Sequence, residues 1–197
     1  MKGKTFIIAG PSGVGKGTII QALFAQQKNL YFSVSATTRA PRPGEVDGVH
    51  YHFLTREQFL RWIEEDAFLE HAEYIGNFYG TPKRYVDEAM DRGEDVILDI
   101  EVQGAEQVYQ KRPDTIRIFI APPSWQELER RLTSRGTETP EKVRGRLARA
   151  REEFSYAEGY NYVVINNTVE EAVREIQAII CAEHCRPAQR IALINGM

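Results

Sequence analysis

The chain has 197 residues, 42% of them hydrophobic and 27% charged, a balance that is typical of one globular domain with a sizeable core. Its formal net charge of -3 creates no field that would attract nucleic acid or an anionic membrane, so we expect neither as a partner. The apolar run near the N-terminus is too short for a signal sequence or a membrane span, and we therefore expect a cytoplasmic protein. Cys181 and Cys185 fit neither a disulfide framework nor a four-ligand zinc site.

Short apolar runs without alternation predict parallel strands that are covered on both faces. These runs are Thr5 to Ala9, Leu30 to Val34, Val96 to Ile100, Ile116 to Ala121 and Tyr162 to Ile165. Helical patterns separate them, and this alternation indicates a three-layer α/β fold with a central parallel sheet of about five strands.

Side chains that can cap a helix N-terminus mark where the helices begin. Capping boxes are predicted for Thr55 with Gln58, Ser124 with Glu127, and Thr168 with Glu171. A cap followed by proline at the first helical position is predicted at Thr81-Pro82 and at Thr139-Pro140.

A glycine-rich loop follows the first strand directly and precedes a helix with an apolar face. A P-loop requires this context, because its backbone N–H groups turn toward one anion at a helix N-terminus. The predicted phosphate-binding residues are Gly10, Pro11, Ser12, Gly13, Val14, Gly15, Lys16, Gly17 and Thr18. We expect Lys16 to reach the β- and γ-phosphates of a nucleotide and to be catalytic.

One position departs from the usual P-loop motif, because Gly17 stands where Ser or Thr normally binds Mg²⁺. The metal would then be held mainly by phosphates and water. Thr18 is the nearest hydroxyl and could reach the ion through water. We therefore assign no direct metal ligand.

The segment from Ala36 to Thr81 interrupts the alternation of strands and helices and is predicted to be an inserted substrate-binding subdomain. Its proline-stiffened loop carries Arg39 and Arg42, which suit bidentate binding of a small dianion such as a monophosphate. Tyr51 could add a hydroxyl donor, as could Tyr79. A solvated loop with exposed charges is the alternative.

Asp99 and Glu101 come at the C-terminal end of the strand that begins at Val96, the edge where parallel α/β sheets bind ligands. Asp99 could organise Mg²⁺ through water or contact the acceptor of a phosphoryl group. A helix cap or a strand-end charge is the alternative for both carboxylates.

The helical stretch from Ser124 to Tyr156 is rich in basic residues and is predicted to be a mobile lid. Its basic side chains are Arg130, Arg131, Arg135, Lys142, Arg144, Arg146, Arg149 and Arg151. For any one of them, a solvated helix face with glutamate partners is the alternative.

The chain closely resembles the guanylate kinase family over residues 4–183. The resemblance lies in the order and spacing of GPSGVGKGT, SATTRAPRPGEVDGVHYHF, FLEHAEYIGNFYGTPK, ILDIEVQGA and RLTSRGTE. It implies one domain over residues 4–184, with a core (1–34, 94–122 and 158–197), a GMP-binding subdomain (35–93) and a lid (123–157). It also implies that ATP and GMP react to give ADP and GDP with Mg²⁺.

The resemblance assigns roles to individual residues. The phosphate of GMP would meet Arg39, Arg42, Tyr51 and Tyr79, the guanine would be read by Ser35, Glu70 and Thr81, and Asp99 and Glu101 would contact the acceptor. Phosphate-stabilising roles fall to Arg135 and Arg146, with Arg131 as a further candidate, and Asn166 would border the adenine. The family often has Asp in place of Glu101 and Ser in place of Gly17.

The chemistry of the bases supports GMP over AMP as the acceptor. Guanine offers N1–H and N2–H₂ donors that the carboxylate of Glu70 can accept, whereas adenine presents an acceptor at N1. The sequence leaves open whether dGMP is also accepted and whether the protein is a monomer or a homo-oligomer.

Two rival functions remain at this stage. Guanylate kinase-like domains also occur as non-catalytic scaffold domains that bind phosphopeptides, but those domains usually lack a working P-loop. A related P-loop kinase of ribose bisphosphate would not need Ser35, Glu70 and Thr81 arranged around a purine.

Overall fold

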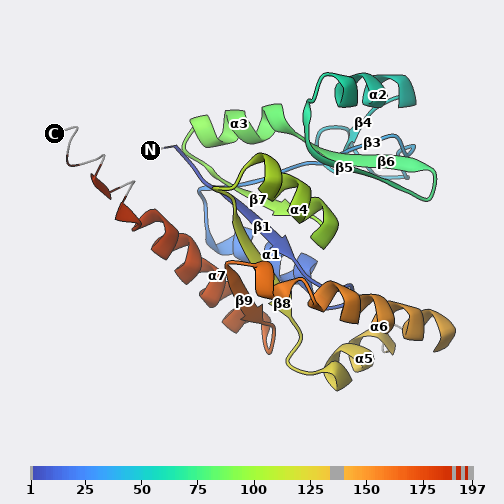
Figure 1. The fold of residues 1–197 in the computed structure, drawn as a ribbon, viewed down its shortest axis with the longest axis vertical. Helices are drawn as coiled ribbons and strands as arrows, with labels where there is room; N and C mark the ends of the chain where they lie inside the picture. The colour runs from blue at the N-terminus through green and yellow to red at the C-terminus, as the bar shows by residue number, and fades with distance from the viewer. Residues whose placement is uncertain (1, 134–139, 188–189, 192–193, 195–197) are drawn as a thin grey trace. The chain divides into compact units, whose positions relative to one another are not determined.

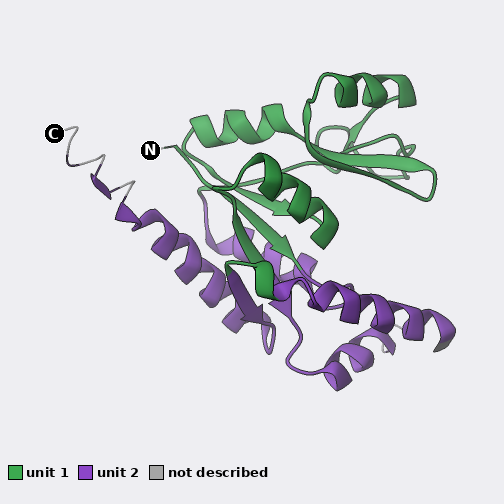
Figure 2. Ribbon diagram, viewed as in Figure 1, with its two compact units in different colours: residues 1–9, 29–118, 158–161 green, residues 10–28, 119–157, 162–197 purple. Residues whose placement is uncertain are grey.

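The computed structural model describes residues 2–133, 140–187, 190–191 and 194, and Figure 1 shows the order of its elements. The chain divides into two compact units (Figure 2). The first holds residues 1–9, 29–118 and 158–161, and the second holds residues 10–28, 119–157 and 162–197. The domain boundaries proposed from the sequence stay a prediction.

A five-stranded sheet runs in the order β2-β7-β1-β8-β9. Its strands are β1 (Thr5–Ala9), β2 (Leu30–Phe32), β7 (Asp95–Asp99), β8 (Ile116–Ala121) and β9 (Tyr162–Ile165). The pairs of β7 with β1 and with β2 are parallel, and all residues of β1 and β8 are buried. The predicted α/β fold with a parallel sheet of five strands is therefore confirmed.

The first unit also contains a four-stranded sheet in the order β4-β3-β6-β5. Its strands are β3 (Ala36–Thr37), β4 (His52–Phe53), β5 (Phe68–Tyr74) and β6 (Asn77–Pro82). Strands β5 and β6 form an antiparallel hairpin, and its turn places Ile75 and Gly76 at positive φ. This sheet was not predicted as strands, because two of its members are only two residues long and give no periodic signal.

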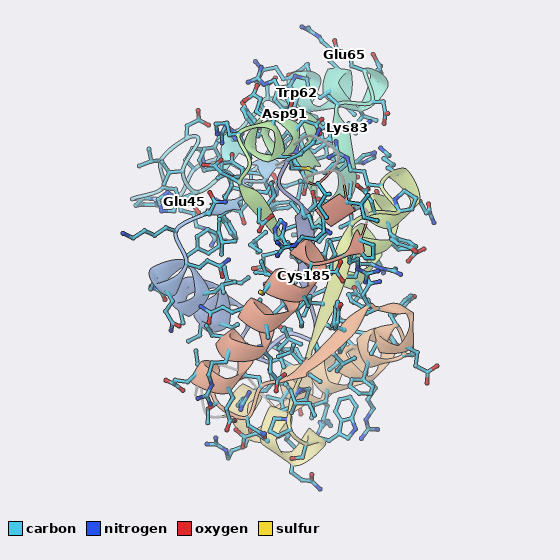
Figure 3. The ribbon with its side chains drawn as sticks, turned by 90° about the vertical axis from the view of Figure 1, so that its left-hand side faces the viewer. Glu45, Trp62, Glu65, Lys83, Asp91 and Cys185 are labelled. Atoms are coloured by element: carbon cyan, nitrogen blue, oxygen red, sulfur yellow. The ribbon has the colours of Figure 1, made fainter. Side chains whose placement is uncertain are left out.

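Helix α2 (Arg56–Glu64) covers part of this small sheet with aromatic side chains. The predicted capping box of Thr55 and Gln58 is confirmed, with both of its hydrogen bonds formed. Phe59 is fully buried and stacks on Phe68, with ring centroids 4.4 Å apart. Trp62, also on α2 (Figure 3), packs against the same cluster. The subdomain therefore has an apolar core of its own.

Two further helices belong to the first unit, α3 (Lys83–Asp91) and α4 (Val102–Lys111). The prediction that Thr81 caps a helix beginning at Pro82 is wrong. Pro82 itself is the N-cap residue of α3 and makes no side-chain cap hydrogen bond. The Thr81 hydroxyl instead donates to the buried carboxylate of Glu70. Strand β6 continues through Thr81 to Pro82, so Thr81 lies inside the strand and α3 begins one residue later than predicted.

The second unit contains the remaining helices. They are α1 (Lys16–Gln26), α5 (Trp125–Thr133), α6 (Pro140–Phe154) and α7 (Val169–His184). The short helix η1 (Ala157–Gly159) follows α6, and its last two residues belong to the first unit. The predicted hydroxyl caps at Ser124 and Thr168 are confirmed, because each accepts from the backbone N–H three residues later. Thr139 lies outside the described residues.

Helices α5 and α6 pack against each other through Leu128, Leu132, Val143 and Ala150. Both cysteines are free and exposed near the end of α7, where Cys185 is labelled in Figure 3. None of the helices in the described part of the chain combines the length and the hydropathy that a membrane crossing needs.

Replacing Phe59 with Ala is expected to lower the free energy of unfolding by about 3–5 kcal/mol, because it removes a fully buried ring from a stacked cluster. Leu60, its exposed neighbour on α2, provides the matched control, since Leu60→Ala should change stability by about 0.5 kcal/mol or less. Urea denaturation followed by near-UV circular dichroism measures both variants. Equal effects would show that the aromatic cluster does not stabilise the subdomain.

Candidate functional site

The glycine-rich loop after β1 places its glycines where the backbone disfavours a side chain. Gly10 has φ 148° and Gly15 has φ 101°, both in the region that side chains disfavour. A Cβ atom on Gly10 would lie 2.3 Å from the carbonyl oxygen of Ile120. Gly15 is the N-cap of α1, so the loop ends where that helix begins. Such a loop at a helix N-terminus can turn backbone N–H groups toward one anion.

Lys16 is the first residue of α1 and folds back over the loop. Its Nζ atom donates to the carbonyl oxygen of Gly10 at 2.6 Å. The ammonium group therefore lies at the helix N-terminus, where the partial positive charge of the helix adds to its own. This end of α1 can bind an anion such as a nucleotide phosphate.

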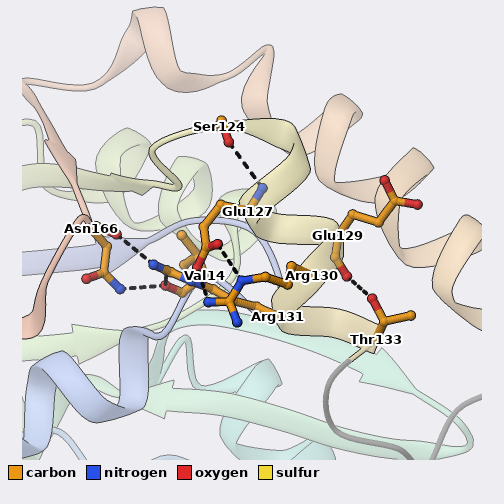
Figure 4. A network of polar contacts seen from close by, with 8 residues as sticks. All are labelled: Val14, Ser124, Glu127, Glu129, Arg130, Arg131, Thr133 and Asn166. Atoms are coloured by element: carbon orange, nitrogen blue, oxygen red, sulfur yellow. Dashed lines mark hydrogen bonds and ion pairs between the residues drawn. The ribbon is translucent and has the colours of Figure 1, made fainter.

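A polar network in the second unit holds the loop against α5 (Figure 4). The guanidinium of Arg131 donates to the carbonyl oxygens of Val14 at 3.1 Å and Asn166 at 3.0 Å. Its Nε atom donates to Glu127, and Asn166 donates its side-chain amide to Val14 at 2.7 Å. Arg130 and Arg131 lower the pKa of Glu127 to about 2. Arg131, a candidate phosphate ligand, thus also ties α5 to the P-loop.

The other lid residues are placed as follows. Arg146, on α6, donates from Nη2 to the hydroxyl of Ser12 in the P-loop at 2.6 Å. This brings a predicted catalytic arginine to the predicted phosphate site. Arg135 lies outside the described residues.

The last two residues of the predicted P-loop, Gly17 and Thr18, are exposed in the first turn of α1.

The predicted anion clamp of the first unit is assembled around Arg39. Its guanidinium donates to Glu45 at 2.8 Å and lies over the ring of Tyr51, with 5.3 Å between Cζ and the ring centroid. The rings of Tyr51 and Tyr79 meet edge to face at 6.1 Å. The side chain of Arg42 is exposed on the same loop. Three of the four predicted phosphate ligands therefore form one group.

Glu45 was not predicted as a site residue, yet it organises this clamp (Figure 3 labels it). One carboxylate oxygen accepts from Arg39, and the other accepts from the backbone N–H of Arg42 at 2.7 Å. These two hydrogen bonds lower the pKa of Glu45 to about 2. An acid a few residues after Arg39 in a proline-stiffened loop was the signal that could have identified it.

Glu70 lies inside the first unit with little access to water, since only 7% of its surface is exposed. The hairpin pairs Glu70 with Thr81, and the Thr81 hydroxyl donates to Oε1 at 2.6 Å. Burial raises the pKa of Glu70, the hydrogen bonds from Thr81 oppose this, and the charge of Glu101 adds to the increase. A buried carboxylate with one strong donor is poised to accept further N–H donors.

The remaining predicted residues lie at the ends of strands. Ser35 is half-buried just before β3, and its carbonyl oxygen accepts from the backbone N–H of His52 at 2.9 Å. Asp99 is the last residue of β7, and Glu101 is the N-cap of α4. Because Glu101 raises the pKa of Glu70 through its charge, these two carboxyl groups belong to one region of the unit.

A glycine cradle with its lysine at the start of α1, after the first strand of a parallel sheet, defines the class of P-loop α/β proteins that bind nucleotide phosphates. The family model described as guanylate kinase matches residues 2–183. The chain belongs to the guanylate kinase family.

Individual relatives agree with this assignment. The chain is 54% identical to a guanylate kinase of Clostridium perfringens strain SM101, over 94% of this chain and 86% of that protein. It is 53% identical to a guanylate kinase of Halalkalibacterium halodurans, over 94% of this chain and 91% of that protein. The crystal structure of guanylate kinase from Anaplasma phagocytophilum is similar with a TM-score of 0.74 at 36% identity, over 95% and 89% of the two chains.

Glu70→Gln is expected to raise the free energy of unfolding of the ligand-free protein at about pH 7, because glutamine fills the same space without a buried charge. The native carboxyl has a raised pKa, so the folded wild type binds a proton at a pH where the unfolded chain has lost it. Wild-type stability therefore falls, relative to the variant, as the pH rises through the native pKa.

Denaturation of both proteins over a pH series tests this expectation. The two stabilities should converge in acid, below the pKa of the unfolded chain, where both side chains are neutral. A variant that is less stable near neutral pH would mean that the surroundings stabilise the Glu70 anion.

Proposed function

We propose that this protein transfers the γ-phosphoryl group of ATP to GMP and produces ADP and GDP. The observation that carries the proposal is the buried pair of Glu70 and Thr81, which belongs to the same unit as a clamp of arginine and tyrosine side chains. A purine monophosphate needs both kinds of contact. Membership of the guanylate kinase family supports this assignment.

The guanine base is read by groups whose hydrogen bonds match its edge. The carboxylate of Glu70 accepts from N1–H and N2–H₂, which an adenine could not provide. Thr81 holds one carboxylate oxygen at 2.6 Å, so the acid is already oriented before the base arrives. Ser35 is the third residue assigned to the base. An acceptor that lacks the paired donors would leave a buried carboxylate unsatisfied, which gives strong discrimination.

The phosphate of GMP binds to the clamp around Arg39. Arg39 and Arg42 supply guanidinium donors, and Tyr51 and Tyr79 supply hydroxyl groups. Glu45 accepts hydrogen bonds from Arg39 and from the backbone N–H of Arg42. The loop is therefore ordered by its own residues, which lowers the cost of ordering it around a dianion.

ATP binds with its phosphates on the P-loop. Lys16 turns from the carbonyl of Gly10 to the β- and γ-phosphates, and Arg146 lies at Ser12 of the same loop. Asn166 contacts Val14 and is assigned to the adenine side. Arg135, together with Arg146, is proposed to neutralise charge on the transferring group.

The residues present fit a Mg²⁺ ion that is held by phosphates and water. A Cβ atom on Gly17 would meet nothing within 4 Å, and Thr18 beside it is exposed, so a hydrated ion has room there. In the described part of the chain, no three His, Cys, Asp or Glu side chains gather into a group that could hold a metal. When bound, the ion neutralises charge on the β- and γ-phosphates. Asp99 and Thr18 are proposed to reach it through water.

The transfer needs no protein nucleophile. A phosphate oxygen of GMP, already ionised, forms a bond to the γ-phosphorus of ATP while the bond to the β,γ-bridging oxygen breaks and ADP leaves. No general base is required, because the attacking oxygen carries no proton that must be removed. The chain's residues orient the two phosphates and neutralise the charge that develops on the transferred group.

The acceptor is tested by ADP formation from ATP and Mg²⁺ with GMP, dGMP, AMP, CMP or UMP. GMP should be turned over in preference to AMP and the pyrimidine nucleotides, and Glu70→Gln should lower kcat/KM for GMP by about 10²-fold, because the variant places an amide where the base needs an acceptor. No turnover with any of these acceptors would favour a phosphopeptide-binding scaffold. Equal turnover of GMP and AMP would contradict the proposal that Glu70 selects guanine over adenine.

Lys16→Met is expected to lower kcat by about 10³-fold or more, since it removes the charge that meets the transferring phosphates. Lys28→Met, which alters an exposed lysine beyond the same helix, provides the control and should keep normal rates. Circular dichroism should show that both variants are folded. A Lys16→Met enzyme with near-normal kcat would contradict phosphoryl transfer at this P-loop.

A further inference from the structure

We propose that helix α4 positions the guanine-reading carboxylate, with Gly104 as the residue that provides its space and Gln107 as the residue that fixes its strand. Both residues are proposed to act through Glu70, as positioning residues. The inference rests on the proposed function and adds specificity-determining positions to it.

Gly104 forms the wall against which the carboxyl group of Glu70 rests. A Cβ atom on Gly104 would lie 3.0 Å from Oε2, 3.3 Å from Cδ and 3.4 Å from Cγ of Glu70. The other oxygen, Oε1, accepts from the Thr81 hydroxyl at 2.6 Å. The carboxyl group is thus confined between a hydroxyl and a glycine, and any larger residue at position 104 would displace it by a few tenths of an ångström.

Backbone conformation does not explain the glycine at this position. Gly104 lies in the third position of α4 and is not among the residues with positive φ. Glycine inside a helix is less favourable than alanine by about 1 kcal/mol. Because helical geometry alone would favour alanine, the space beside Glu70 is the reason for glycine here.

Gln107 holds the strand that carries Glu70. Its side-chain amide accepts from the backbone N–H of His71 at 3.2 Å and donates to the carbonyl oxygen of His71 at 3.3 Å. Strand β5 is the edge of its sheet, so Gln107 supplies the pair of hydrogen bonds that a neighbouring strand would give.

Lys111 adds a third contact from the same helix face. Its ammonium donates to the carbonyl oxygen of Phe68 at 2.8 Å. The spacing of Gly104, Gln107 and Lys111 places them along one face of an α-helix. The backbone of β5 is therefore fixed before Glu70, at Phe68, and after it, at His71. Helix α4 thus determines where the carboxylate lies.

Gly104→Ala tests whether the space beside the Glu70 carboxyl group is needed for GMP binding. We expect the KM for GMP to rise about tenfold while kcat and the KM for ATP stay within about twofold, because a shift of this size weakens hydrogen bonds to the base and leaves the donor site unchanged. Gly159→Ala is the matched control, since an added Cβ there meets nothing within 4 Å. A normal KM for GMP in Gly104→Ala would overturn the role of Gly104.

A double-mutant cycle distinguishes displacement of the Glu70 carboxylate from a general effect of the substitution on the fold. In a Glu70→Ala background no carboxylate is left to displace, so adding Gly104→Ala should change kcat/KM for GMP by less than about twofold. If Gly104 supported the fold in another way, its effect would persist in that background. A penalty that persists unchanged would therefore overturn the inference.

Gln107→Met provides a second, independent variant, because it keeps the length of the side chain and the helix propensity but removes both hydrogen bonds to His71. We expect a higher KM for GMP and an unchanged KM for ATP. Gln110→Met, at an exposed position of the same helix, is the control. Equal kinetics of the two variants would overturn the role of Gln107.

These outcomes are distinct from failure of the proposed function. If the wild-type enzyme does not phosphorylate GMP, the proposed function fails and the inference fails with it. If the wild type is GMP-selective and Gly104→Ala, Gln107→Met and their controls behave alike, only the inference fails.

Discussion

Burial of one carboxyl group is the constraint around which the first unit is arranged. Glu70 is held between the Thr81 hydroxyl and the surface of Gly104, and the edge of its strand is bonded to α4. Burial raises the pKa of Glu70, so an ionised carboxyl group in this place lowers the stability of the fold. In the proposed function, a base that donates two N–H groups to Glu70 offsets that cost, so selectivity for the base has the same physical origin.

The ion pairs of Glu45 and Glu127 have a different role. Both carboxylates are partly buried, and arginine partners lower their pKa values to about 2. What they determine is geometry. Glu45 fixes the loop that carries Arg39 and Arg42, and Glu127 orients Arg131 toward the carbonyl groups of the P-loop and of Asn166. Each unit therefore orders arginines with a carboxylate of its own.

Features that depend on neighbouring residues in the chain could be predicted, whereas features that depend on contacts between distant segments could not. The apolar runs became the strands of the parallel sheet. Thr55, Ser124 and Thr168 cap helices because their partners lie three residues away in the chain. The cap predicted at Thr81 rested on the following proline instead, but strand β6 continues to Pro82 and the Thr81 hydroxyl donates to Glu70, eleven residues earlier. Strands β3 and β4 are two residues long and form by pairing with other segments. They are too short to give a periodic pattern in the sequence.

The same distinction between local and distant contacts applies to the residues of the proposed site. The P-loop could be recognised because all of its groups are consecutive, and the arginine clamp because its loop is stiffened by proline. Gly104 gave no such signal, since a glycine near a helix start looks like a local weakness in the chain. Its meaning depends on Glu70, which approaches from another strand. Glycine in α4, where alanine would be more stable, costs about 1 kcal/mol of helix stability. In the proposed site this cost leaves the space that the carboxyl group of Glu70 occupies.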